Sequence, residues 1–344
     1  MSLTYLQTLM DGKHGVDVSK VLPLLDRFEG LNQVEFPSSE CKFRYDANKL
    51  QMWMKAGDTE YEVGPDGYKK AMRIAGFAES VIKKYPRTIM MDPLNWGFRE
   101  KMKNVRAFAK GKKLIAFVKP TVELVSTRNL VNICSRVCGE NAVFERLDHD
   151  MSFTNCSIIV GDRFREWEDS RLKQNDVVCG GINWQNSLMG EVPMIVSVYA
   201  YRLVCSNGMI SADQSFKWSR NTETIPMEEW FEERVTEGLN LITEELNKVD
   251  TLRNTLVDPK HRHDVIANVF SEFGLSDRIK HLVMERFLQE PPINMWDIVN
   301  AITNVANDED ISDNPLQVRR IQLVGGEIAA KASVCPTCYS VSRG

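Results

Sequence analysis

The clearest spacing signal for metal chemistry is a pair of cysteines near the end of the chain. Cys335-Pro-Thr-Cys338 has the spacing of half a zinc site, since two thiolates this far apart bind one tetrahedral ion. No second CxxC or CxxH motif completes it. Two copies of the chain could supply four thiolates, or Cys134 and Cys138 could join the pair. The simpler interpretation is a dithiol in a mobile tail, so we expect no cofactor, and zinc at Cys335 and Cys338 is the alternative.

Asp148-His149-Asp150 is the other group that could bind a divalent cation. Such a site would serve a metal-dependent nuclease or hydrolase. Alternation along a strand places the two aspartates on one face and His149 on the other, so a single site would require a loop. A solvated turn is the alternative interpretation.

Nucleophilic catalysis has one superficial candidate. Cys205 ends an apolar run, but a cysteine nucleophile needs a base within reach, and the sequence identifies none. The chain also lacks a P-loop, a GxGxxG motif and an HExxH motif. We therefore interpret Cys205 as a buried structural residue, and nothing in the sequence demands an enzyme.

The overall net charge of −4 hides a strong local asymmetry. Residues 87–120 carry nine basic and two acidic residues, a net charge of +7. Aromatic residues alternate with these cations, as in proteins that hold phosphates with cations and stack bases on rings. In the alternative interpretation the rings are core and the lysines only solubilise a hairpin tip. The nucleic-acid-binding candidates are Arg99, Lys101, Lys103, Arg106, Lys110, Lys112, Lys113 and Lys119, and the aromatic residues are Trp96, Phe98, Phe108 and Phe117.

Residues 223–250 carry nine acidic and two basic residues, a net charge of −7. The basic hairpin could dock on this acidic helix, within one chain or in a neighbouring subunit. The same helix could instead bind a host partner.

Composition and length indicate an ordinary globular protein. The 344 residues are 43% hydrophobic and 26% charged, which is typical of folded domains. Residues 1–10 show no signal peptide, and the apolar stretch near 192–201 is too short to span a bilayer. Eight cysteines are too few for a disulfide scaffold. We expect a cytoplasmic protein without a membrane partner, located in the host cytoplasm if a phage encodes it.

The pattern of elements predicts an α+β fold: a mainly antiparallel sheet with a basic β-hairpin, followed by a C-terminal helical region packed on it. Residues 105–109 and 114–118 form the hairpin, and 177–184 pairs with 192–204. Helices follow from residue 226 onward. The predicted divisions are a mixed N-terminal region over 1–85, a sheet core over 86–220, a helical region over 221–332 and a flexible tail over 333–344.

Local signals add detail to this pattern. Gly64-Pro65-Asp66-Gly67 predicts a turn before a helix over 68–85. Ser126 or Thr127 caps a helix that Gly139 stops. The segment 153–160 predicts a strand, and the polar residues 162–176 predict a loop or short helix.

Three segments resemble one known family. Residues 201–209 read YRLVCSNGM, residues 181–190 read GINWQNSLMG, and residues 294–303 read NMWDIVNAIT. Together with 71–78 and Asn95-Trp96, these runs resemble the phage/plasmid-like protein family, a domain of unknown function (932). The resemblance covers about 60–330 and implies a role in mobile-element DNA metabolism, but it supplies no catalytic residues. The signature residues are Asn183, Asn186, Arg202, Cys205, Asn207 and Gly208.

These signature residues also have physical interpretations. Arg202 interrupts a run that is apolar on both faces, so it needs an acidic or carbonyl partner. Asn207-Gly208 accepts the positive φ of a tight turn. Asn183, Gln185 and Asn186 would form a polar cluster at one end of the sheet, or amides that cap a bend.

These observations favour an oligomeric single-stranded DNA binder or annealing accessory in recombination or replication. A metal-dependent nuclease or hydrolase and a phage structural or host-interaction protein are the alternatives.

Overall fold

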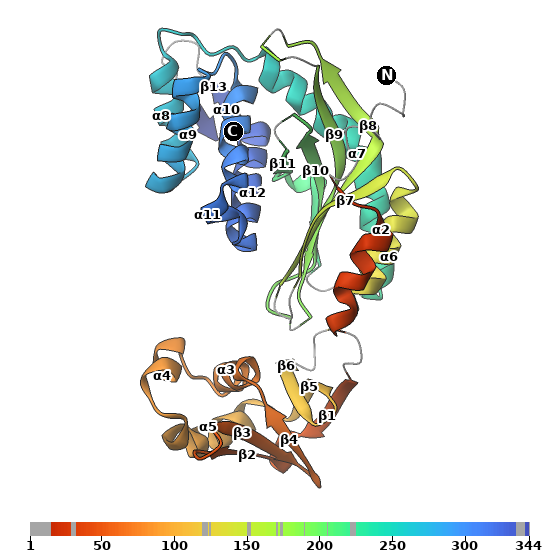
Figure 1. The fold of residues 1–344 in the computed structure, drawn as a ribbon, viewed down its shortest axis with the longest axis vertical. Coiled ribbons are helices and arrows are strands. Elements are labelled where there is room, and N and C mark those ends of the chain that lie inside the picture. Colours follow the sequence, from red (N-terminus) through yellow and green to blue (C-terminus); the bar gives the residue numbers. More distant parts are fainter. Residues whose placement is uncertain are drawn as a thin grey trace. The chain divides into compact units, whose positions relative to one another are not determined.

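The computed structural model shows two compact units, each with its own sheet (Figure 1). The first unit contains Met1–Leu24, Ser126–Asn186 and Val192–Gly344, and the second contains Leu25–Val125 and Ser187–Glu191. The α+β class is confirmed. The structure describes residues 15–28, 32–118, 123, 125–149, 153–169, 171–172, 175–188, 190–204, 206–220, 225–334 and 341–343.

The second unit is a six-stranded sheet with helices on one face. The strand order is β1-β5-β6-β4-β3-β2, and every neighbouring pair is antiparallel except β4 and β6. Its strands are β1 (Asn32–Pro37), β2 (Cys41–Asp46), β3 (Gln51–Ala56), β4 (Thr59–Val63), β5 (Asn104–Lys110) and β6 (Lys113–Val118). Its helices are α3 (Pro65–Ile74), α4 (Glu79–Lys84) and α5 (Arg87–Lys101). The hairpin expected over 105–118 is confirmed as β5 and β6.

Three phenylalanines from different elements form the centre of this core. Phe43 on β2, Phe98 on α5 and Phe117 on β6 pack edge to face, with ring centroids 5.0 to 5.9 Å apart. The buried Asn95 fixes α5 to β2, because it accepts from the backbone N–H of Phe43 at 2.6 Å and donates to its carbonyl at 2.9 Å. This packing holds β6, and with it the hairpin, against the helical layer.

One local expectation in this unit is wrong. The residues Gly64-Pro65-Asp66-Gly67 do not form a separate turn, because α3 begins at Pro65 with Gly64 as its N-cap. Proline suits this first helical position, where its missing N–H has no intrahelical partner to lose. The helix predicted over 68–85 is also two helices, α3 and α4, since the chain turns between them at residues 75–78.

The first unit is an antiparallel sheet between two helical layers (Figure 1). The strand order is β11-β10-β9-β8-β7, and β12 also pairs with β10. The strands are β7 (Ala142–His149), β8 (Thr154–Trp167), β9 (Asp176–Asn186), β10 (Ile195–Arg202), β11 (Asn207–Ile210) and β12 (Lys217–Ser219). The expected central position of the run after residue 194 is confirmed, because β10 lies between β9 and β11 and is buried almost throughout.

One face of this sheet packs against the long helix α7 (Met227–Asn254). Trp184 of β9 meets Phe231 of α7 with ring centroids 5.5 Å apart. Gly180 of β9 permits this close approach, since a Cβ at that position would lie 2.0 Å from Ile242 Cγ2. The helix α6 (Thr127–Cys138), capped at Ser126 and stopped at Gly139 as expected, packs on α7, and the short α2 (Val18–Val21) packs near it.

The C-terminal helices cover the opposite face. The helix α12 (Pro315–Lys331) packs on β11 and on α10 (Met295–Asn304). The remaining helices are α8 (Arg262–Glu272), α9 (Asp277–Gln289) and α11 (Glu309–Ser312). The expected packing of the helical region on the sheet is therefore observed. Within the described part of the chain, no helix is long and apolar enough to cross a bilayer.

Three segment boundaries differ from the expectations. The sheet core expected over 86–220 is divided, because its basic hairpin belongs to the second unit and its later strands to the first. Strand β8 continues to Trp167, where a loop or short helix was predicted, and its register with β9 shifts between Ile159 and Phe164. In the C-terminal tail, β13 (Ala332–Val334) pairs with β14 (Val341–Arg343).

Candidate functional site

The tip of the basic hairpin carries three exposed lysines. Lys110 ends β5, Lys113 begins β6, and Lys112 lies in the turn between them. No ion pair joins these lysines to any residue that the structure describes. Cations without acidic partners remain available to an external anion. Lys119, the next predicted cation, lies outside the described residues.

The other predicted cations lie at the base of the same hairpin. Arg99, Lys101 and Lys103 are exposed around the end of α5, and Arg99 Nε donates to the carbonyl of Asn95 at 3.1 Å. Arg106, midway along β5, is bound to Glu35 at 2.6 Å. Strands rise ~3.3 Å per residue, so base and tip are on the order of 20 Å apart. The seven candidates that the structure describes therefore do not form one contiguous surface.

The phenylalanines of the basic segment are buried in the protein, as the alternative interpretation of the sequence expected. Phe98 and Phe117 have no exposed surface, and Phe108 is only 8% exposed. Rings this buried cannot stack on bases, so the hypothesis that these phenylalanines bind a single strand is wrong. Trp96 is 69% exposed, but it lies on α5, away from the hairpin strands.

A row of side chains that we did not identify from the sequence crosses the open face of this sheet. Met52 and Met54 of β3 are buried in the core, so Trp53 between them lies on the opposite face. Cross-strand pairing places Arg44 beside Trp53, Trp53 beside Glu62, and Glu62 beside Lys113, which pairs with Lys110. The Arg44 guanidinium lies over the half-buried Trp53 ring, 5.6 Å from its centroid.

A second row follows the same open face. Lys42, Lys55 and Glu60 are cross-strand neighbours, and Glu60 binds Arg44 at 2.8 Å. We call the two rows and the turn lysine the open-face patch. Six cations and two carboxylates give it a net charge of +4. Its members are Lys42, Arg44, Trp53, Lys55, Glu60, Glu62, Lys110, Lys112 and Lys113.

In the first unit, the structure brings the segments 201–209 and 294–303 into contact. Asn207 of β11 donates through Nδ2 to Thr303 Oγ1 at 2.6 Å and to Asn300 Oδ1 at 3.3 Å, both on α10. Asn307, just beyond α10, donates to the carbonyl of Ser206 at 3.0 Å. The strand end after residue 201 and the helix after residue 294 therefore form one polar junction.

Asn207 and Gly208 do not form the expected turn. Asn207 already begins β11, and the positive φ of 51° lies at the residue before it, Ser206. Gly208 is required for another reason, because a Cβ there would lie 1.8 Å from the hydroxyl oxygen of Tyr199. That hydroxyl donates to Glu145 Oε2 at 3.2 Å, and burial raises the pKa of Glu145 to about 7.

Arg202 has the acidic partner that its position required. Its Nε donates to Asp176 Oδ1 at 2.7 Å, and Arg253 Nη1 donates to Asp176 Oδ2 at 2.6 Å. Asp176 has no exposed surface. Two guanidinium groups thus share one buried carboxylate at the end of the sheet.

The amide residues of β9 have separate roles. Asn183 Nδ2 donates to Asn155 Oδ1, Ser157 Oγ and the carbonyl of Cys156 at 3.0 to 3.2 Å, so it joins β9 to β8. Arg319 of α12 donates to Asn155 and Asn183, and burial lowers its pKa to about 10.

The other two amides of β9 do not extend this network. Gln185 donates to the carbonyl of Pro193 at 3.3 Å, and Asn186 is buried at the end of the strand. The sequence predicts a polar cluster of three neighbouring amides. Among the described hydrogen bonds, Asn183 is the one of these three that joins the network between β8, β9 and α12.

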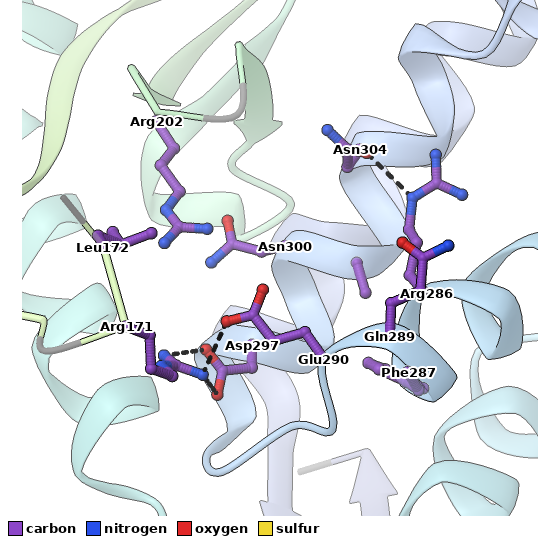
Figure 2. Close-up of a pocket in the computed structure, with 11 residues that line it drawn as sticks. Arg171, Leu172, Arg202, Arg286, Phe287, Gln289, Glu290, Asp297, Asn300 and Asn304 are labelled. Carbon is purple, nitrogen blue, oxygen red and sulfur yellow. Dashed lines mark hydrogen bonds and ion pairs between the residues drawn. The ribbon is translucent and has the colours of Figure 1, made fainter.

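Arg202 and Asn300 both line a pocket of about 340 Å³ (Figure 2). It is formed by the end of β10, residues 171–172, the C-terminal part of α9, and α10. Its lining is mostly polar, with three arginines. The lining residues are Arg171, Leu172, Arg202, Arg286, Phe287, Gln289, Glu290, Asp297, Asn300, Ala301 and Asn304.

Comparisons of this chain with models of protein families, with curated proteins and with solved structures find no match.

The candidate metal ligands are engaged by protein groups where the structure describes them. Asp148 Oδ2 accepts from Arg146 Nε at 2.6 Å, and His149 Nδ1 lies 2.7 Å from Thr154 Oγ1. Burial raises the pKa of the Cys134 and Cys138 thiols, that of Cys138 to about 12. Over the described ranges, no group of three or more His, Cys, Asp or Glu side chains could hold a metal ion. Asp150, Cys205, Cys335 and Cys338 lie outside the described residues.

The acidic helix α7 uses several carboxylates within the first unit. Glu232 binds Arg136 of α6 through two hydrogen bonds of 2.7 Å. Asp250 accepts from Trp167 Nε1 at 2.8 Å, and the buried Glu245 accepts from Ser211 Oγ, just after β11, at 3.1 Å. These carboxylates fasten α7 to α6 and to the sheet, so part of its negative charge has a structural role.

Proposed function

We propose that the chain binds single-stranded nucleic acid through the open-face patch of its second unit. The observation that carries this proposal is the position of Trp53, a half-buried ring on the open sheet face. Its cross-strand neighbours are Arg44 and Glu62, and Lys113 lies beyond Glu62. A ring of this kind offers a base a flat surface, and base–aromatic stacking contributes ~1–3 kcal/mol per base.

The charges of the patch support the same proposal. Lys110, Lys112 and Lys113 have no acidic partner in the described structure and lie at the edge of the row that contains Trp53. Cations arranged beside a stacking ring suit a flexible strand, because phosphates and bases are then held at different points. Glu62 lies within the row, so the patch is better suited to contacts at separate points than to a continuous phosphate track.

The biological setting belongs to the proposal as well. The resemblance to the phage/plasmid-like family favours DNA metabolism of a mobile element, with the chain as a non-catalytic binding or annealing accessory in the host cytoplasm. A homo-oligomer would repeat the open-face patch along one strand. The nuclease alternative receives less support, since Asp148 is held by Arg146.

Replacement of Trp53 tests the proposal directly. Trp53→Ala should weaken binding of a fluorescent oligothymidylate by ~1–3 kcal/mol, or about 5- to 150-fold, in a titration at low salt. Trp96→Ala is the matched control, because Trp96 is an exposed tryptophan of the same unit outside the patch. It should bind as wild type does.

A core variant separates stacking from folding. Phe117→Ala should destabilise the second unit by ~3–5 kcal/mol, seen as a lower melting temperature, whereas Trp53→Ala should melt near wild type. Equal affinities of the Trp53 variant and wild type, equal losses in both tryptophan variants, or no binding by wild type would each contradict the proposal.

A further inference from the structure

The pocket in the first unit contains a buried hydrogen-bond donor that has no acceptor. Asn300 is only 5% exposed and lines the pocket. Its Oδ1 accepts from Asn207, but its Nδ2 has no hydrogen-bond partner in the described structure. A buried donor without an acceptor costs ~1–3 kcal/mol, so this amide is placed to meet an acceptor that the described residues do not supply.

The guanidinium group of Arg202 lines the pocket together with Asn300. Figure 2 shows the side chains of Arg202 and Asn300 pointing toward one another, from β10 and α10. Arg202 and Arg253 both bind the carboxylate of Asp176, which holds the Arg202 side chain in place. An acceptor placed between Arg202 and Asn300 would satisfy the amide and lie beside a guanidinium group.

The other arginines of the pocket are held in place by protein carboxylates. Arg171 binds Asp169 at 2.8 Å and Asp297 at 3.0 Å. Arg286 donates to Asp308 at 2.6 Å and to Asn304 at 3.0 Å. Side chains fixed in this way lose little conformational freedom when a ligand arrives.

We propose that this pocket binds a phosphate group, with Asn300 Nδ2 and the Arg202 guanidinium as donors. Guanidinium and amide N–H groups match phosphate oxygens in geometry and charge. The volume of about 340 Å³ exceeds the need of a phosphate alone and lies at the small end of ligand pockets. Glu290 and Asp297 also line the pocket and bind Arg171, so they disfavour a second anion and can accept from hydroxyl or amine groups. A nucleoside monophosphate has this polarity.

The proposal concerns the first unit and does not rest on nucleic-acid binding by the second. Isothermal titration with inorganic phosphate and with a deoxynucleoside 5′-monophosphate tests it on the full chain. We expect a Kd below about 1 mM for at least one probe. Equal affinities indicate that only the phosphate is recognised, and tighter binding of the monophosphate indicates that Glu290 and Asp297 take part.

Asn300→Asp is the sharpest variant, because it keeps the acceptor for Asn207 and replaces the unpaired donor with a carboxylate. It should weaken probe binding at least about tenfold while the melting temperature holds or rises, since the new carboxylate faces Arg202. Asn247→Asp is the matched control, because it makes the same change at an exposed contact with Arg165. It should bind the probes as wild type does.

A second variant covers the case in which Asn300→Asp does not fold. Asn300→Ala removes the donor without adding charge, and it should also lose affinity. Failure of both probes to bind wild type would overturn the proposal. Wild-type affinity in the Asn300 variants, or an equal loss in Asn247→Asp, would overturn it as well.

Discussion

Asn207 Nδ2 lies 2.6 Å from the hydroxyl oxygen of Thr303, and this hydrogen bond joins two segments that are 96 residues apart in the chain. Both ends are buried, and Thr303 Oγ1 also donates to the carbonyl of Val299 at 2.9 Å. The strand β11 is therefore anchored to α10, the helix whose Asn300 lines the polar pocket. Two segments that are distant in the sequence serve one structural junction.

Neutralising the hairpin tip should change the salt dependence of nucleic-acid binding. Replacing Lys110, Lys112 and Lys113 together with Gln should lower the slope of log K against log salt by about two units for a single strand, at ~0.7 per phosphate contact. Binding titrations at several salt concentrations measure this slope. The melting temperature should barely move, because exposed charges without partners contribute little to stability.

The control for this variant removes three exposed lysines elsewhere, Lys20, Lys84 and Lys260. Its slope should equal that of wild type. A tip variant with an unchanged slope would show that the tip does not contact phosphates.

The buried group of Arg202, Asp176 and Arg253 predicts unequal costs for its members. Asp176→Asn removes the buried carboxylate that Arg202 and Arg253 both bind, so it should destabilise the protein by ~3–5 kcal/mol. Arg202→Met should cost less, since Arg253 still neutralises Asp176. Chemical denaturation of both variants gives the comparison. A larger loss in the Arg202 variant would contradict this account of the group.

Glu145 should make stability depend on pH. Its ordinary pKa of 4.5 is raised to about 7 in the folded protein, chiefly by burial. The folded state therefore holds this proton more tightly than the unfolded chain does. The resulting stability is fully present below about pH 4.5 and is lost as pH rises through about 7.

Glu145→Gln tests this dependence, because glutamine keeps an acceptor for the Tyr199 hydroxyl and cannot ionise. Between pH 5 and 8, wild type should lose on the order of 2 kcal/mol of unfolding free energy relative to the variant. Denaturant titrations at four or five pH values provide the measurement. Parallel pH profiles for the two proteins would show that Glu145 does not titrate in this range.

Local patterns predicted many elements because their signals lie within a few residues. The hairpin of β5 and β6, the helix α6 with its ends at Ser126 and Gly139, and the C-terminal helices all follow from turn chemistry or from a 3.6-residue period. The helix α10 begins with a capping box between Asn294 and Asp297. Such a motif can be recognised from the residue types at these two positions. The requirement for a partner of Arg202 also followed from the sequence, although the identity of Asp176 did not.

The sequence alone determined the α+β class, the basic hairpin and the need to neutralise a buried arginine, since each depends on residue type and short spacing. Only the tertiary structure decided that Phe98 and Phe117 are core, that Trp53 belongs to an open face, and that Asn300 meets Arg202 at a pocket. The physical reason is that these features depend on strand register and on contacts between distant segments. A phenylalanine beside lysines has the same local pattern whether its ring meets a base or another ring, and packing across the sheet decides between them.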